Sequence, residues 1–171
     1  MIVETPRLVL RRFRPDEDLD GFAAVCADAE VMRFIGTGRT LTRSETRGLL
    51  ATIERHWDDH GFGLWAVDVD GEVAGFSGLA IPSFLPQVLP AVECGWRLGR
   101  PWWGRGLATE AARAALDWGW AELGLRGVVS IIGTGNARSV RVAEKLGMRR
   151  GADRLHPGTG LRVHVYERER P

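Results

Sequence analysis

The sequence has 171 residues, of which 44% are hydrophobic and 26% are charged, a composition typical of one soluble globular domain. Its 23 basic and 22 acidic residues give a formal net charge of +1, which excludes an overall positive field that would hold a nucleic-acid backbone. No apolar run approaches the roughly 18 residues that cross a bilayer, and the first residues lack the pattern of a signal peptide. We therefore expect a single cytoplasmic domain over residues 1–171, with no nucleic-acid or membrane partner.

The first third of the chain predicts one strand followed by two helices. Residues 7–13 predict a short strand, and Pro15–Asp18 then supplies the proline and the carboxylates with which helices begin. A second helix is indicated by the capping box Thr42–Glu45, which precedes apolar residues on one face and a stop at Gly61.

The middle of the chain predicts a hairpin and a further strand. Residues 64–69 and 72–79 flank Asp70–Gly71, a strong signal for two antiparallel strands. Residues 91–98 predict another strand, in which side chains alternate between the two faces. One face carries Glu93, Gly95 and Arg97.

The second half predicts a strand–helix–strand unit, whose two strands are then parallel. A glycine-rich turn leads into an alanine-rich helix that ends at Gly124, and residues 128–132 form the next strand. A last helix over Asn136–Leu146 precedes a hairpin around residues 157–160. These elements predict an α/β fold with a mixed sheet of about six to seven strands, antiparallel in its N-terminal part, and about four helices.

The turn before the alanine-rich helix carries small residues at alternate positions, Gly104, Gly106 and Ala108. Small side chains let backbone N–H groups approach a ligand, and a helix N-terminus favours negative charge. Three arginines are candidate donors to phosphates: Arg100, Arg105 and Arg138. A P-loop is disfavoured because no Gly-Lys-Ser/Thr ends the turn, and Thr109 stands where a dinucleotide fingerprint needs glycine. The turn alone predicts an anion site or only a tight turn.

The sequence resembles the GNAT superfamily of acetyltransferases over nearly its whole length, and within it the RimJ/RimL-type branch, which acetylates protein N-termini and related amines. The resemblance rests on blocks in the right order, which are Glu4–Arg11, Glu93–Trp96, Trp103–Ala111, and Asn136 with Ser139 ahead of Glu144–Met148. Several ordered blocks are far more specific than one turn.

The resemblance implies a parallel central strand pair that splays apart, with the pantetheine arm of acetyl-CoA in the gap. It also implies backbone binding of the pyrophosphate. No metal is expected, and the residues expected at the cofactor are Trp96, Arg97, Leu98, Arg100, Trp103, Gly104, Arg105, Gly106, Leu107, Ala108, Thr109, Asn136, Arg138 and Ser139. Many members have Gln or Arg in place of Trp103, so only backbone binding is expected there. Ala143 stands where many members carry a tyrosine acid.

The implied reaction is direct attack of a neutral amine on the thioester. Deprotonation at pH 7 costs roughly 4.6 kcal/mol for a lysine but only about 1 to 1.4 kcal/mol for an α-amino group, which favours a peptide N-terminus as acceptor. Glu93 is the candidate base; acceptor binding and structural pairing with an arginine are the alternatives. Ser139 is the candidate donor to the leaving thiolate, although Asn136 is also explained as a plain helix N-cap.

Other features have two interpretations each. His56 and His60 superficially suggest a metal pair, but no third ligand stands at a recognisable spacing. Their position at the border of a buried helix face explains them more simply. The apolar residues 81–90 predict an acceptor-pocket wall or a homodimer contact rather than a plain loop. Cys26 and Cys94 are expected to be buried free thiols. A small-molecule or antibiotic acetyltransferase, and a CoA-binding sensor without activity, are the competing functions.

Overall fold

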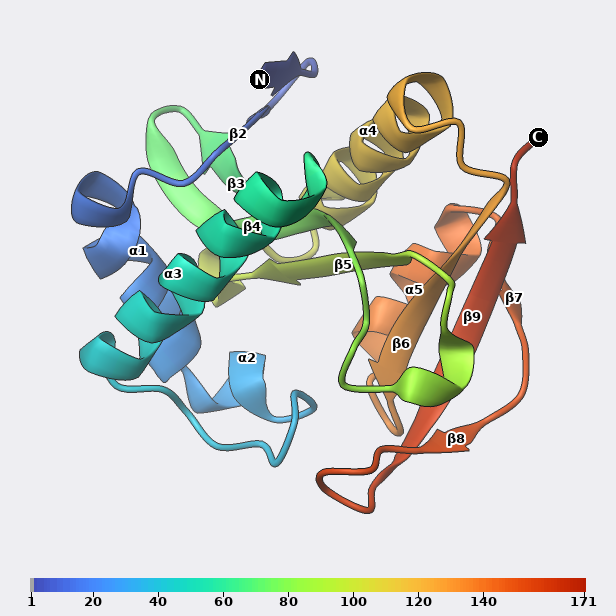
Figure 1. The fold of residues 1–171 in the computed structure, drawn as a ribbon. Helices are drawn as coiled ribbons and strands as arrows, with labels where there is room; N and C mark the ends of the chain where they lie inside the picture. Colours follow the sequence, from blue (N-terminus) through green and yellow to red (C-terminus); the bar gives the residue numbers. More distant parts are fainter. Residues whose placement is uncertain (1) are drawn as a thin grey trace.

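The computed structural model describes residues 2–171, which form one mixed sheet with helices on both faces (Figure 1). The strands lie in the order β1-β2-β3-β4-β5-β6-β9-β7, and β8 pairs with β9. Their bounds are β1 Ile2–Glu4, β2 Val9–Arg11, β3 Leu64–Val69, β4 Glu72–Ala80, β5 Glu93–Leu98, β6 Gly127–Gly133, β7 Arg149–Arg150, β8 Arg154–Leu155 and β9 Arg162–Glu169. The α-helices are α1 Pro15–Ala27, α2 Ala29–Met32, α3 Arg43–His60, α4 Leu107–Glu122 and α5 Ala137–Lys145, with 3-10 turns η1 Pro86–Val88 and η2 Arg100–Trp102.

The predicted mixed α/β architecture is confirmed, but over residues 2–171 the sheet has nine strands rather than about six to seven. A fifth helix, α2, was also not expected. The additional elements are short, since β1 has three residues, β7 two and α2 four. Segments of this length show no hydrophobic period, so only their pairing within the fold defines them.

The local signals for the hairpin and for helix α3 are confirmed. Asp70 and Gly71 have φ values of 54° and 87°, the pair of positive angles that a two-residue hairpin turn needs. At the start of α3, the Glu45 N–H donates to Thr42 Oγ1 over 3.2 Å, and the Thr42 N–H donates to the Glu45 carboxylate over 2.7 Å. Gly61 ends the helix in the left-handed conformation, with φ 74°.

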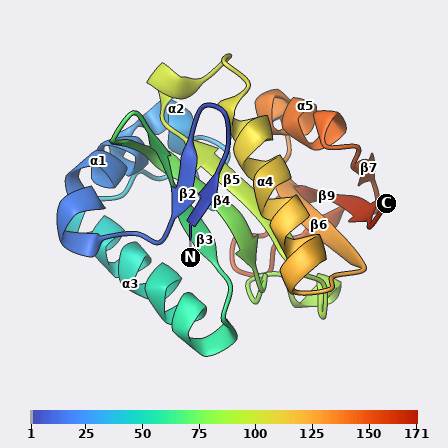
Figure 2. The same ribbon diagram turned by 90° about the horizontal axis from the view of Figure 1, so that it is seen from above.

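Two layers of helices lie on opposite faces of the sheet (Figure 2). Side chains along β5 point alternately to one layer and to the other. The Arg97 side chain reaches Cys26 of α1, whereas Cys94 of the same strand contacts the Ala112 carbonyl of α4. Helix α1 packs on β4 and α3, and α4 packs on β4 and β5. Glu93 and Arg97 therefore share the α1 face.

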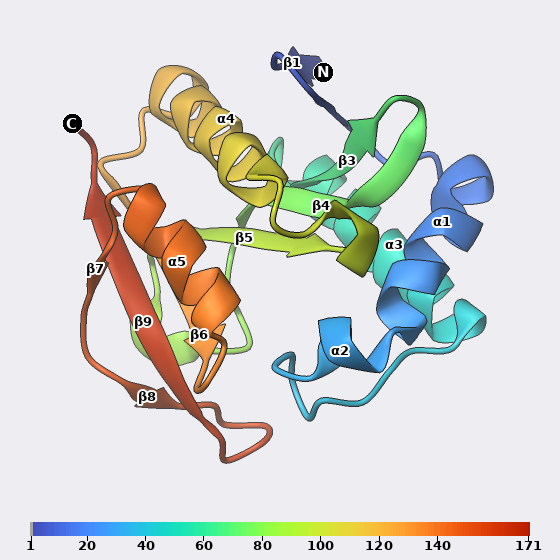
Figure 3. The same ribbon diagram turned by 180° about the vertical axis from the view of Figure 1, so that it is seen from behind.

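The parallel pair β5–β6 separates soon after it forms. Within the described part of the chain, Glu93 opposite Val129 is its one registered pair, whereas β6 pairs with β9 over its whole length, Gly127–Gly133. Beyond this pair the strands β5 and β6 diverge, as Figure 3 shows. The Ser130 hydroxyl donates to the Cys94 carbonyl over 2.6 Å at the start of the divergence. The edge of β5 beyond this point faces a gap in the sheet.

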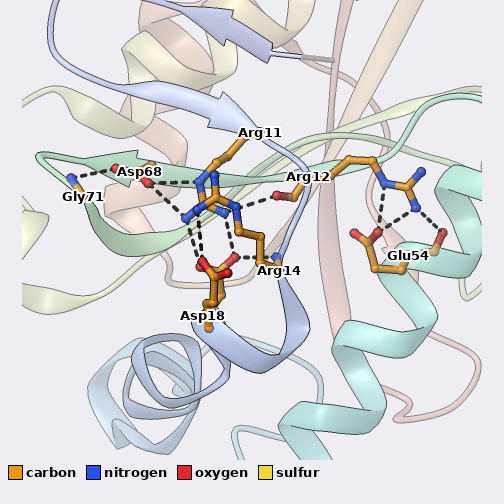
Figure 4. Close-up of polar contacts among 8 residues, drawn as sticks. Arg11, Arg12, Arg14, Asp18, Glu54, Asp68 and Gly71 are labelled. Carbon is orange, nitrogen blue, oxygen red and sulfur yellow. Dashed lines mark hydrogen bonds and ion pairs between the residues drawn. The ribbon is translucent and has the colours of Figure 1, made fainter.

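An ion-pair network joins the first strands to the helices α1 and α3 (Figure 4). The Arg11 guanidinium donates two hydrogen bonds to Asp18 of α1, of 2.7 and 2.9 Å, and a third of 3.0 Å to Asp68 of β3. Arg12 binds Glu54 of α3. Arg11 and Asp18 are both buried, so their mutual pairing compensates the loss of water around each charge. Within residues 2–171, no helix combines the length and apolar character that a membrane span requires.

Candidate functional site

The gap between β5 and β6 opens into a cavity of about 740 Å³, within the range of small-molecule sites. Side chains of β5 and β6, the turn after β5, and helix α5 line one part of it. Residues of α2, α3 and the loop after β4 line the other part. Because Arg97 lies on the α1 face and the turn begins α4 on the opposite face, the cavity passes through the sheet at the gap.

The turn before α4 presents unused backbone donors to this cavity. Gly104 and Gly106 have φ values of 73° and 78°, a left-handed conformation that side chains disfavour. Gly106 is the N-cap of α4, and no side chain in the described part of the chain caps the helix. The first amides of a helix have no partner within the helix, and here Leu107, Ala108 and Thr109 line the cavity. Free N–H groups at the positive end of a 16-residue helix favour an anion.

The basic side chains at the cavity come mainly from helix α5. Arg138, Arg141 and Lys145 all line the cavity. Sequence reasoning singled out only Arg138, although the spacing of three and then four residues places all of them on one helix face. These cations add to the positive potential beside the turn.

Trp103 does more than provide a backbone amide. Its indole N–H donates to the Leu98 carbonyl over 2.7 Å, which fixes the turn against β5. The Arg138 guanidinium stacks on the same indole, 4.3 Å from the ring centroid, a cation–π contact. Trp103 thereby joins the turn to helix α5 across the cavity.

Arg100 and Arg105, the other two arginines predicted to meet phosphates, do not line the cavity. The Arg100 guanidinium pairs with Asp28, the N-cap residue of α2. Arg105 lies over the Trp102 ring at 5.2 Å, and its carbonyl accepts a 2.7 Å hydrogen bond from Arg7. Their contact with a phosphate stays a prediction.

Glu93 lies where the two central strands part. Its side chain is partly accessible and lines the cavity. Burial raises the pKa of this carboxyl from 4.5 to about 7, and a hydrogen bond with the Ile131 backbone lowers it only in part. No basic side chain within residues 2–171 contributes to this shift, so structural pairing with an arginine finds no support. A carboxyl that titrates near neutral pH can accept a proton there.

Asn136 and Ser139 also line the cavity, from the first turn of α5. The Asn136 side-chain oxygen accepts the Ser139 backbone N–H over 3.1 Å, so Asn136 is the helix N-cap, one of the two interpretations drawn from the sequence. The Ser139 side chain is half-buried at the cavity. Ala143, one turn further, is fully buried.

The family follows from comparison with known proteins. Residues 7–149 match the model of the acetyltransferase (GNAT) domain. The chain belongs to the GNAT acetyltransferases. YkkB of Bacillus subtilis is 32% identical over 146 residues, covering 84% of this chain and 83% of YkkB. The acetyltransferase from Agrobacterium tumefaciens superimposes with a TM-score of 0.82 at 28% identity, covering 99% of this chain and 95% of that one.

A RimL alpha-N-protein acetyltransferase solved in complex with coenzyme A shares the fold, with a TM-score of 0.77 at 16% identity and coverage of 99% and 98%. Acetyl-CoA is the acetyl donor of GNAT enzymes. The residues of this enzyme fit such a ligand, because the uncapped N-terminus of α4 suits a pyrophosphate. The open edge of β5 likewise provides backbone groups for an extended arm.

His56 is engaged on both ring nitrogens in this GNAT enzyme. Nδ1 contacts the Phe62 carbonyl at 2.8 Å, and Nε2 accepts the Ile81 N–H over 3.1 Å. Burial lowers the pKa of His56, which favours the neutral ring that this pattern requires. Its role is to tie α3 to the end of β4. Within the described residues 2–171, no group of three potential metal ligands is found.

The loop after β4 contributes to the cavity wall. Ile81, Ser83 and Phe84 line the cavity, and Phe84 stacks on His156 at 5.5 Å between ring centroids. Leu85 is fully buried against Val129 and its neighbours. This placement agrees with a pocket wall, one of the interpretations of residues 81–90. Cys26 and Cys94 are buried free thiols, as predicted.

Proposed function

We propose that this GNAT enzyme transfers the acetyl group of acetyl-CoA to the α-amino group at the N-terminus of a peptide or protein. The observation that supports this acceptor is the carboxyl of Glu93, which lines the cavity with a pKa of about 7. Such a base matches an α-ammonium of pKa about 7.7 to 8 closely enough for proton transfer, but a lysine of pKa about 10.4 poorly.

The cofactor would be held by groups that leave the reacting end free to meet the amine. The N–H groups of Leu107, Ala108 and Thr109 bind the pyrophosphate, and the α5 cations Arg138, Arg141 and Lys145 balance its charge. The backbone of β5 from Trp96 to Leu98 pairs with the pantetheine arm. Acetyl-CoA supplies an acyl carbon activated as a thioester.

Two side chains of the enzyme then act as proton acceptor and as hydrogen-bond donor. Glu93 accepts the proton of the α-ammonium, directly or through a water molecule, so that a neutral amine faces the thioester. Ser139 donates a hydrogen bond to the departing sulfur, which needs no strong acid because a thiol has a pKa around 8.5. The absence of a tyrosine at Ala143 is therefore compatible with turnover.

The test is thiol release from acetyl-CoA with N-terminal peptides, polyamines, free amino acids and aminoglycosides. We expect turnover with the peptides, and we expect Glu93→Gln to lower kcat by about 10²-fold or more without a change in CoA affinity. Glu122→Gln, at the exposed end of α4, is the matched control. Turnover confined to one of the small amines would move the proposal to a small-molecule acetyltransferase, and no turnover at all would favour a CoA sensor.

A further inference from the structure

Arg97 is a cavity-lining cation with few partners in the protein. It lies on β5, on the α1 face that also carries Glu93, and its side chain lines the same cavity. Its Nη1 donates to the Cys26 thiol over 3.5 Å, and its guanidinium lies 5.0 Å from the centroid of the Phe76 ring. Among residues 2–171 the buried Nε finds no hydrogen-bond partner. A thiol and a ring face are weak partners for a guanidinium.

This arrangement is unusual for a buried charge. Arg11 in the same molecule is surrounded by two carboxylates, Asp18 and Asp68, whereas no carboxylate within residues 2–171 contributes to the electrostatic environment of Arg97. A buried cation without a counterion is unfavourable. An anionic group bound in the cavity would provide the missing partner.

The strand sets the spacing of the two residues that carry the charged groups of the cavity. The Cα atoms of Glu93 and Arg97 are four residues apart on one face of β5, about 13 Å along the strand. Gly95 lies between them, and a Cβ at Gly95 would meet only the Phe76 ring, at 3.9 Å. Between these two residues β5 therefore presents no side chain to the cavity that all three line.

A short extended peptide matches this spacing. Two residues of extended chain cover about 7 Å of this spacing, and the remainder is of the order that an acidic side chain and a hydrogen bond of about 2.9 Å cover. With the α-amine at Glu93, the side chain of the second residue would come near Arg97.

We propose that Arg97 selects acceptor peptides with a carboxylate side chain at the second residue, by binding that carboxylate while Glu93 receives the α-amine. The inference rests on the proposed N-terminal acetylation and names its substrate class. The acceptor is a peptide of the form Ala-Glu or Ala-Asp at its start. Arg97 is a specificity-determining residue in this scheme: its backbone belongs to the stretch of β5 assigned to the pantetheine arm, and its side chain binds the acceptor.

The experiment compares three peptides that differ only at the second residue, Ala-Glu, Ala-Gln and Ala-Lys. The wild type and Arg97→Met are assayed by thiol release, with calorimetric CoA binding as the measure of folding and cofactor affinity. Methionine retains apolar packing against Phe76. Arg126→Met, an exposed arginine in the loop between α4 and β6, is the matched control.

We expect the wild type to prefer Ala-Glu over Ala-Gln by about 10- to 100-fold in kcat/KM, the range expected for one hydrogen bond to a charged group. Arg97→Met should lose this preference when the peptides are compared at saturating acetyl-CoA, and Arg97→Glu should favour Ala-Lys. Turnover of all three peptides at equal rates, or a preference that survives in Arg97→Met, would overturn the role of Arg97 while the proposed function stands.

A binding assay gives a result even without turnover. The acetylated product Ac-Ala-Glu should raise the melting temperature of the wild type more than Ac-Ala-Gln does, and Arg97→Met should not distinguish them. If Arg97→Met does not fold, Arg97→Lys takes its place, because a point charge keeps the attraction but loses the fork geometry; its preference should then be reduced but still present. Equal shifts for both products in the wild type would refute the carboxylate site.

Discussion

Glu93 should reduce stability while it supports activity. In the folded enzyme the pKa of this carboxyl is about 7, compared with an ordinary value of 4.5. The folded state therefore retains the proton to a higher pH than the unfolded chain does. It follows that the contribution of Glu93 to the free energy of unfolding falls as the pH rises from about 4.5 to 7.

The size of this effect follows from the shift. One pKa unit corresponds to about 1.4 kcal/mol, so the full shift corresponds to about 3 kcal/mol once the pH exceeds 7. Between pH 5 and pH 8, the wild type should lose about 2.5 kcal/mol through this group. Glu93→Gln has no such titration. The free energy of unfolding of Glu93→Gln, relative to that of the wild type, should therefore rise by about 2.5 kcal/mol between pH 5 and pH 8.

Urea unfolding of both proteins at pH 5, 6.5 and 8 measures this difference, and Glu122→Gln shows how an exposed carboxylate behaves. The pH dependence of the difference is the decisive quantity, because any packing cost of the amide is the same at each pH. The same substitution should remove the limb near pH 7 from the profile of kcat/KM, leaving the limb of the acceptor amine near pH 8. A stability difference that stays constant from pH 5 to pH 8 would refute the raised pKa of Glu93.

Three further substitutions test the turn and the framework. Gly106→Val should weaken calorimetric CoA affinity by about 10-fold. A side chain disfavours the left-handed backbone by roughly 1–2 kcal/mol, and a turn that leaves this conformation no longer directs its N–H groups at the ligand. Equal affinity would argue against backbone binding of the pyrophosphate by this turn. Trp103→Phe removes the hydrogen bond to Leu98 and should raise the Kd for CoA several-fold by the same measurement. Arg11→Met leaves Asp18 and Asp68 without their shared cation and should lower the free energy of unfolding by about 3–5 kcal/mol in urea; a loss under about 1 kcal/mol would show that the network is not stabilising.

The sequence by itself determined the elements whose signals are local. The turn at Asp70–Gly71, the capping box at Thr42 and the glycine stop at Gly61 depend on neighbouring residues, and each was found where it was predicted. Alternation along β5 likewise placed Glu93 and Arg97 on one face. These features could be read from the sequence because backbone conformation and side-chain direction follow from short-range sterics.

The tertiary structure alone decided which charged side chains meet. Arg100 and Arg138 are equally basic in the sequence, yet one pairs with Asp28 and the other stacks on Trp103 beside the cavity. The environment of Arg97 and the raised pKa of Glu93 also depend on residues remote in the chain. Contacts and desolvation arise from the packing of distant segments, and no local pattern encodes them.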